Sequence, residues 1–182
     1  MAQLRADARR NRERILAAAE EVFAERGASA STEEVAARAG VAIGTVFRHF
    51  PTKDDLLAAI FKALLARLVS EAGELAGSGD PETALFAFFT RVVEAAAARR
   101  TVAELLTGGG ADLRLGGALR ALDEPLGTLL RRAQEAGAVR ADVRLEEVRA
   151  LLAAASQAAL LAGWTPELQD RTLEIIFRGC RP

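Results

Sequence analysis

The chain has 182 residues, of which 51% are hydrophobic and 27% charged, and its formal net charge is −1 at pH 7. This amount of apolar material can form a core, which excludes a disordered chain, and the near-zero charge argues against a non-specific nucleic-acid coat. With one cysteine, one histidine and no apolar segment long enough for a bilayer, the sequence also excludes an internal disulfide, a zinc site and a membrane span.

The composition predicts an all-α fold of about nine helices, because alanine and leucine dominate and unbranched side chains lose little rotamer freedom in a helix. The first helix is expected over about 8–26, where apolar residues recur at helical spacing, and Gly27 ends it. Residues 1–14 carry five arginines and only two acidic residues. Such a run is typical either of a solvated arm or of an element that approaches DNA.

A second, short helix is expected after Ser31. The hydroxyl of Ser31 can cap the first amides, and Glu34, three residues later, can reach back to the backbone of Ser31, which is the spacing of a capping box. Gly40 then allows the left-handed turn that ends this helix and redirects the chain. A third helix over about 43–50 has to be short, because Pro51 disfavours helical geometry in the residue before it.

The remaining helices follow from clear starts and breaks. Thr52 can cap a fourth helix that runs to about residue 76, and the segment 77–81 is the clearest break in the chain. Three consecutive glycines at 108–110 indicate a flexible connection, and Pro125 indicates a kink or a restart in its helix. The helices expected after the break cover about 82–100, 102–106, 119–135, 146–162 and 166–178.

Two short helices joined by a tight glycine turn have the geometry of a DNA-binding helix-turn-helix, although helix pairs of this kind are common. Residues 32–57 read TEEVAARAGVAIGTVFRHFPTKDDLL. This run resembles the signature of the TetR/AcrR family of transcriptional regulators, and the specific resemblance covers about 9–60. It implies a helix-turn-helix DNA-binding domain over 1–52 and a regulatory domain over 53–182 that binds a small molecule and dimerises.

The third helix is then expected to read DNA. Gly44 has no side chain, so the start of this helix can lie close to the groove floor or to a phosphate. Thr45 can donate to a phosphate or contact a thymine methyl, and Arg48 can pair with both acceptors of a guanine. The core, by contrast, is expected to hold Val46 and Phe50. The predicted DNA-binding residues are Thr32, Ala42, Ile43, Gly44, Thr45, Phe47, Arg48, His49 and Lys53.

Some of these roles depend on the resemblance. It implies contacts to the DNA backbone from Thr32 and His49. Lys53 lies in the first turn of a helix, where a cation opposes the helix dipole, and a phosphate partner would account for it. Phe47 and Ala42 depart from the family pattern, which commonly has tyrosine and serine there, so we expect weaker phosphate anchoring at both positions.

A regulatory pocket is expected among the later helices. Few charged residues interrupt their apolar faces, so the effector is expected to be a small apolar or amphipathic molecule. Residues 117–182 resemble one of the family's regulatory-domain branches. The candidate pocket residues, each of which also suits an ordinary core position, are Phe61, Leu65, Phe86, Phe89, Val93, Leu105, Leu122, Leu126, Leu129 and Trp164.

Specific operator binding is expected to need a homodimer, because one short recognition helix reads only a few base pairs and two copies must lie about 34–36 Å apart. Two apolar stripes on the last two helices can pair across a two-fold axis as a four-helix bundle. A monomer that buries both stripes is the alternative. The stripes consist of Val148, Leu151, Leu152, Ala155 and Ala159, and of Leu168, Thr172, Ile175 and Ile176.

Together these features predict a ligand-responsive repressor that releases a palindromic operator, located in the cytoplasm and without a cofactor, a metal or a membrane partner. An enzyme is disfavoured, because the sequence has no nucleophile elbow, no paired-histidine helix and no glycine-rich phosphate loop after a strand. A further alternative is a helical module that binds a small molecule or a protein without binding DNA.

Overall fold

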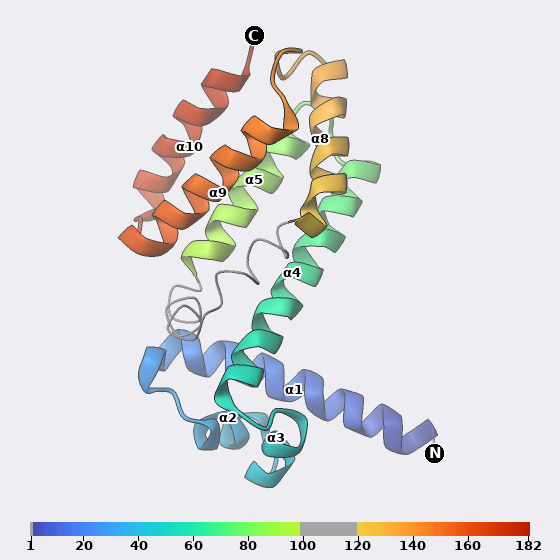
Figure 1. Ribbon diagram of the computed structural model, residues 1–182, viewed down its shortest axis with the longest axis vertical. Helices are drawn as coiled ribbons and strands as arrows, with labels where there is room; N and C mark the ends of the chain where they lie inside the picture. The colour runs from blue at the N-terminus through green and yellow to red at the C-terminus, as the bar shows by residue number, and fades with distance from the viewer. Residues whose placement is uncertain (1, 99–119) are drawn as a thin grey trace. The chain divides into compact units, whose positions relative to one another are not determined.

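The computed structural model describes residues 2–98 and 120–182 (Figure 1). The prediction of an all-α fold is confirmed, because the regular structure of these residues consists of eight α-helices and two short 3-10 helices. Contacts divide the chain into two compact units, and the boundary falls between Leu64 and Leu65. The helix expected at 102–106 and the glycines at 108–110 lie outside the described residues.

The first unit is built from three helices and the start of a fourth. These are α1 (Ala2–Arg26), α2 (Thr32–Ala39), α3 (Ile43–His49) and the first part of α4 (Lys53–Ser78), with a 3-10 turn, η1 (Gly27–Ser29), after α1. Helix α1 begins six residues earlier than expected. Its first turns contain neither glycine nor proline, so nothing local stops the helix from extending toward the N-terminus.

The core of the first unit collects apolar residues from all four helices, and α1 packs extensively against α2. Val46 of α3 has no exposed surface and Phe50, just after α3, is 3% exposed, so both are core residues as predicted. They attach α3 to the rest of the unit. The other large side chains of this core are Ile15, Leu16, Val22, Phe23, Val35, Leu56, Leu57 and Ile60.

The second unit contains the rest of α4 and four further α-helices. Figure 1 shows α9 and α10 side by side, and α5 packs against both α8 and α9. Pro125 lies in the first turn of α8, after a 3-10 turn, so the predicted restart is observed. The bounds are α5 (Ala84–Ala97), η2 (Arg120–Leu122), α8 (Asp123–Glu135), α9 (Leu145–Ala162) and α10 (Pro166–Cys180).

Arg132 of α8 holds the C-terminal end of α4. Its guanidinium donates to the carbonyl oxygens of Leu75 (3.1 Å), Ala76 and Gly79 (3.0 Å), in the last turn of α4 and just after it. The Leu75 oxygen also accepts from the Gly79 amide (2.9 Å). A Cβ at Gly79 would lie 2.6 Å from the carbonyl oxygen of Leu75, so only glycine fits at this position. The end of α4 is therefore fixed by one arginine and one glycine.

The last two helices lie close to their predicted bounds, and local signals that were not predicted set their ends. Gly163, with φ of 60°, ends α9, and the Thr165 hydroxyl accepts a hydrogen bond from the Leu168 amide to cap α10. None of the helices within residues 2–98 and 120–182 has both the length and the apolar character that a membrane span requires.

Candidate nucleic-acid interface

The turn between α2 and α3 is fixed from both sides. At the start of α2 the predicted capping box is present: the Ser31 hydroxyl accepts from the Glu34 amide (3.2 Å), and the Glu34 carboxylate accepts from the Ser31 amide (3.0 Å). This backbone hydrogen bond is the main reason why the pKa of Glu34 is lowered. At the end of α2, Gly40 has φ of 64°, and Val41 donates to the Ala36 carbonyl (3.0 Å).

Arg14 of α1 binds this turn directly. Its guanidinium donates to the carbonyl oxygens of Ala39 (2.5 Å) and Gly40 (3.3 Å). The same nitrogen would lie 3.0 Å from a Cβ at Gly40, so a larger residue would disturb both the backbone and Arg14. No local sequence pattern indicates this contact, because the partners are 25 and 26 positions apart. Arg14 therefore connects α1 to the turn that leads into α3.

Helix α3 buries one face and exposes the other. Val46 points into the core, whereas Ile43, Gly44, Phe47 and Arg48 are exposed. Among the other predicted DNA-binding positions on and beside this helix, Ala42 is exposed and both Thr45 and His49 are half-buried. Four of the predicted residues of α3 therefore face solvent, and the other two are partly covered.

Thr32 and Lys53 lie at the starts of α2 and α4, outside this helix. Both are half-buried. The Lys53 ammonium donates to the carbonyl oxygen of Ala30 (2.8 Å) and lies 5.4 Å from the centre of the Phe23 ring. Lys53 therefore has partners inside the first unit as well as access to solvent.

The arginines of the N-terminal run have different environments. Arg9 and Arg10 are exposed and pair within α1 with Glu13 and Asp7, respectively. The Arg12 guanidinium lies 5.3 Å from the centre of the Phe50 ring, a cation–π distance. With Arg14 on the turn, two of these four arginines contact the helix-turn-helix itself.

Arg38 of α2 joins α2 to α1 through two carboxylates. It donates to Glu25 (2.8 and 3.1 Å) and to Glu21 (3.0 Å). The hydrogen bonds from Arg38 lower the pKa of Glu25, and the same bonds raise the pKa of Arg38. Because all three groups are exposed, these pairs orient α2 more than they stabilise the fold.

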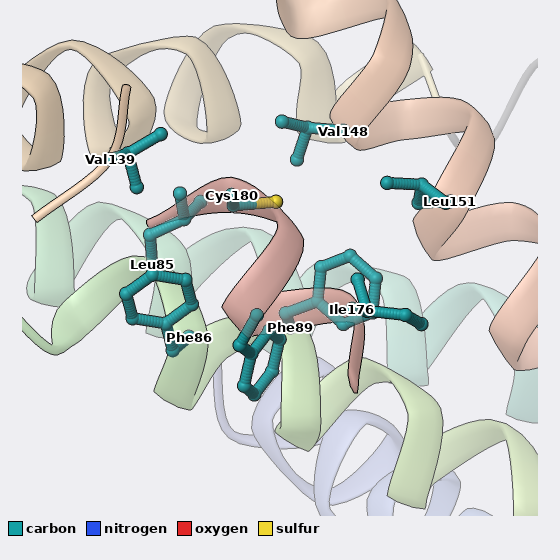
Figure 2. A pocket seen from close by; sticks show the side chains of 9 residues that line it. Leu85, Phe86, Phe89, Val139, Val148, Leu151, Ile176 and Cys180 are labelled. Atoms are coloured by element: carbon teal, nitrogen blue, oxygen red, sulfur yellow. The ribbon is translucent and has the colours of Figure 1, made fainter. Parts of the chain in front are cut away.

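The predicted pocket residues mostly form core in the second unit. Phe86, Phe89, Val93, Leu122, Leu126 and Leu129 are buried, whereas Phe61, Leu65 and Trp164 are half-buried and Leu105 lies outside the described residues. Only Phe86 and Phe89 among them line the small apolar cavity of Figure 2, together with Leu85, Val139, Val148, Leu151, Ile176, Phe177 and Cys180.

This cavity has room for no more than about one water molecule. The ring of Phe177 lines the cavity, with its centre 4.8 Å from that of Phe86 and 5.5 Å from that of Phe89. Phe177 is not among the predicted pocket residues. Its spacing of four from Leu173, which is also buried, is the signal that could have identified it.

The two predicted dimer stripes differ in their exposure. Val148, Leu152, Ala155 and Ala159 are buried within the chain, because this face of α9 packs against α5. They are core residues here and form no exposed stripe. On α10, Thr172 and Ile176 are half-buried. The large apolar side chains left exposed on α9 and α10 are Leu151, Leu161, Leu168 and Ile175.

A short helix that is held by a glycine turn and presents its outer face to solvent is the arrangement found in helix-turn-helix DNA-binding proteins. A family model described as "Bacterial regulatory proteins, tetR family" matches residues 15–60. A second model, "Transcriptional regulator SbtR-like, C-terminal domain", matches residues 80–182. The chain belongs to the TetR family, and it is a DNA-binding transcriptional regulator, not an enzyme.

Solved structures support this assignment over almost the whole chain. The TetR transcription regulatory protein from Mycobacterium vanbaalenii is 40% identical, with a TM-score of 0.79 over 98% of this chain and 99% of its own. The TetR regulator SCO0520 from Streptomyces coelicolor is 32% identical, with a TM-score of 0.76 over 94% and 98% of the two chains. The repressor Rv3405c from Mycobacterium tuberculosis is 51% identical over 55 residues, which span 30% of this chain and 29% of that repressor.

Proposed function

We propose that this regulator is a homodimeric repressor whose two α3 helices bind a palindromic operator, and that a small apolar or amphipathic molecule in the second unit releases it. The observation that carries the proposal is the outer face of α3. It exposes Arg48 to solvent and leaves Thr45 and His49 partly accessible. These side chains supply donors for base edges and phosphates on a helix short enough to enter the major groove.

Exposed apolar residues on the last two helices support a dimer. Ile175 is 73% exposed, and Leu161 and Leu168 are also among the most exposed large apolar side chains of the second unit. Exposed large apolar side chains mark protein interfaces where they gather into one patch. A two-fold axis through this surface would pair α9 and α10 with their copies in a four-helix bundle.

Replacing Ile175 by glutamate is expected to dissociate the dimer. At a two-fold interface the change buries two carboxylates without partners, and we expect the dimer dissociation constant to rise by at least about 100-fold. Sedimentation equilibrium measures this directly. The matched control is Ala87→Glu, at an exposed position of α5 outside the apolar surface, which should leave the assembly unchanged. Equal behaviour of the two variants would place the dimer contact elsewhere.

The apolar interior of the second unit supports an apolar effector. The cavity of Figure 2 is lined by apolar side chains, among them aromatic rings, and by no charged group. An apolar ligand could therefore enter, because its contacts with the rings would replace the contacts that the rings make with one another. A structure with this fold, RolR, was solved in complex with resorcinol; it is 18% identical to this chain, with a TM-score of 0.60. Release from DNA would then be a population shift toward dimers with a different spacing of the α3 helices.

Gly44 offers a test that separates folding from DNA binding. A Cβ at Gly44 would meet no atom within 4 Å, so Gly44→Ala fits the free protein and should stabilise α3 by up to about 1 kcal/mol. If the start of α3 lies against DNA, the added methyl should nevertheless weaken binding, by about tenfold or more. Urea unfolding and fluorescence anisotropy with a selected operator duplex measure the two effects.

The control for this test is Gly73→Ala in α4, where a Cβ also meets no atom within 4 Å. It should give a similar gain in stability without any change in DNA affinity. Unchanged operator affinity in Gly44→Ala would contradict the proposed placement of α3 against DNA. Failure of the wild-type chain to select any duplex would instead favour the alternative of a module that does not bind DNA.

A further inference from the structure

The recognition helix also presents an apolar pair whose exposure the fold does not explain. Ile43 is 37% exposed and Phe47 is 45% exposed. Among the side chains described in the first unit, no other large hydrophobic residue is exposed. An exposed phenylalanine on a small, otherwise well-packed unit costs free energy in water. A binding partner that removes the ring from water would account for its position on the surface.

The spacing of Ile43 and Phe47 places both side chains on one side of α3, where they can contact the same partner. Residues four apart lie on the same side of a helix, with Cβ atoms about 5–6 Å apart. Gly44, between them in sequence, is exposed and has open space around it, so no bulky side chain blocks close approach. Arg48 follows Phe47 directly and is also exposed. The apolar pair is thus part of the same surface that carries the polar DNA-reading groups.

We infer that Ile43 and Phe47 are specificity-determining residues that read thymine through its C5-methyl group, an inference that depends on the proposed operator binding. In the major groove, the thymine methyl is the one apolar group on the base edges, and it marks a T·A pair uniquely. Successive base pairs are about 3.4 Å apart along the helix axis. Two side chains 5–6 Å apart therefore fit thymines in adjacent or next-adjacent pairs of each half-site.

The competing role for this surface is phosphate anchoring, which Phe47 cannot provide. A phenyl ring has no donor for a phosphate oxygen, and Ile43 has none either. Contact between these side chains and the charged backbone would leave phosphates desolvated without compensation. Contact with thymine methyls instead removes two apolar surfaces from water together, which is favourable on both sides.

The test removes the methyl from the DNA and leaves the protein unchanged. An operator is first selected from a random duplex library with the full-length wild-type chain. Each thymine of the selected half-site is then replaced by deoxyuridine, which keeps every hydrogen bond and deletes only the methyl. We expect about a fourfold loss of affinity for each contacted methyl, at one or two positions per half-site. Thymines outside the half-sites should show no loss.

Protein variants assign the effect to the pair. Phe47→Ala and Ile43→Ala should bind the thymine and uracil operators equally at the position that each residue contacts, with circular dichroism as the check on folding. Lys62→Ala, at an exposed position of α4 outside both α3 and the proposed dimer surface, should keep the full discrimination. If wild type selects an operator but every uracil substitution is neutral, methyl readout is refuted while DNA binding stands. If wild type selects no sequence at all, the proposed function fails first.

Discussion

Arg48→Ala is expected to remove most sequence-specific binding while leaving non-specific binding nearly intact. Arg48 is exposed on α3, where a guanidinium can donate to O6 and N7 of one guanine. A bidentate contact of this kind contributes about 1–3 kcal/mol, and a symmetric dimer loses it twice. The operator dissociation constant should therefore rise by roughly 30-fold to 10⁴-fold.

The measurement is fluorescence anisotropy at fixed salt with the selected operator and with duplexes in which one guanine of each half-site is changed. Wild type should discriminate between these duplexes, and Arg48→Ala should not. Lys62→Ala, an exposed cation of α4, serves as the control and should retain the discrimination. If Arg48→Ala weakens binding to all duplexes equally and reduces the salt dependence, Arg48 contacts a phosphate and base readout lies elsewhere.

Arg132→Met should have the largest effect on folding stability among exposed or half-buried arginines. The change removes charge-assisted hydrogen bonds to three carbonyl groups at the end of α4 while keeping an apolar side chain of similar length. We expect the second unit to lose about 2–4 kcal/mol of unfolding free energy, since the bonds are not additive and water can replace some of them. Urea unfolding followed by circular dichroism gives this value.

The neighbouring Arg131 provides a matched control. It is exposed and pairs with Glu135, one turn away at 3.9 Å, so Arg131→Met should change stability by no more than about 0.5 kcal/mol. Arg132→Lys should recover only part of the loss, because a single ammonium cannot reach three carbonyls with the geometry of a guanidinium. Equal midpoints for the Arg131 and Arg132 methionine variants would show that the contact to α4 contributes nothing.

Local signals predicted the DNA-binding region well. Ser31 with Glu34, Gly40 and Pro51 set the bounds of two short helices by caps, a left-handed turn and a steric stop, and each acts within a few residues. The outward face of α3 followed from the same pattern, because Val46 and Phe50 mark the inner face. Residues that act over short chain distances are the ones that a sequence describes most directly.

Contacts between distant segments were not predictable in the same way. Arg14 and Arg132 bind backbone carbonyls more than 20 positions away, and no periodicity marks such partners. The α9 residues Val148 and Leu152 have helical spacing that suits a dimer interface as well as an intramolecular core. Periodicity identifies an apolar face, but only the tertiary packing decides which neighbour covers it.

The most direct test of operator binding is a footprint of the full-length chain on DNA recovered by selection. Operator binding by a two-fold dimer predicts two protected half-sites of inverted sequence, with centres about 10–10.5 base pairs, or a multiple of that spacing, apart. Protection should vanish in Arg48→Ala at the same protein concentration. A single unpaired site, or no protection of any duplex at low salt, would contradict the account.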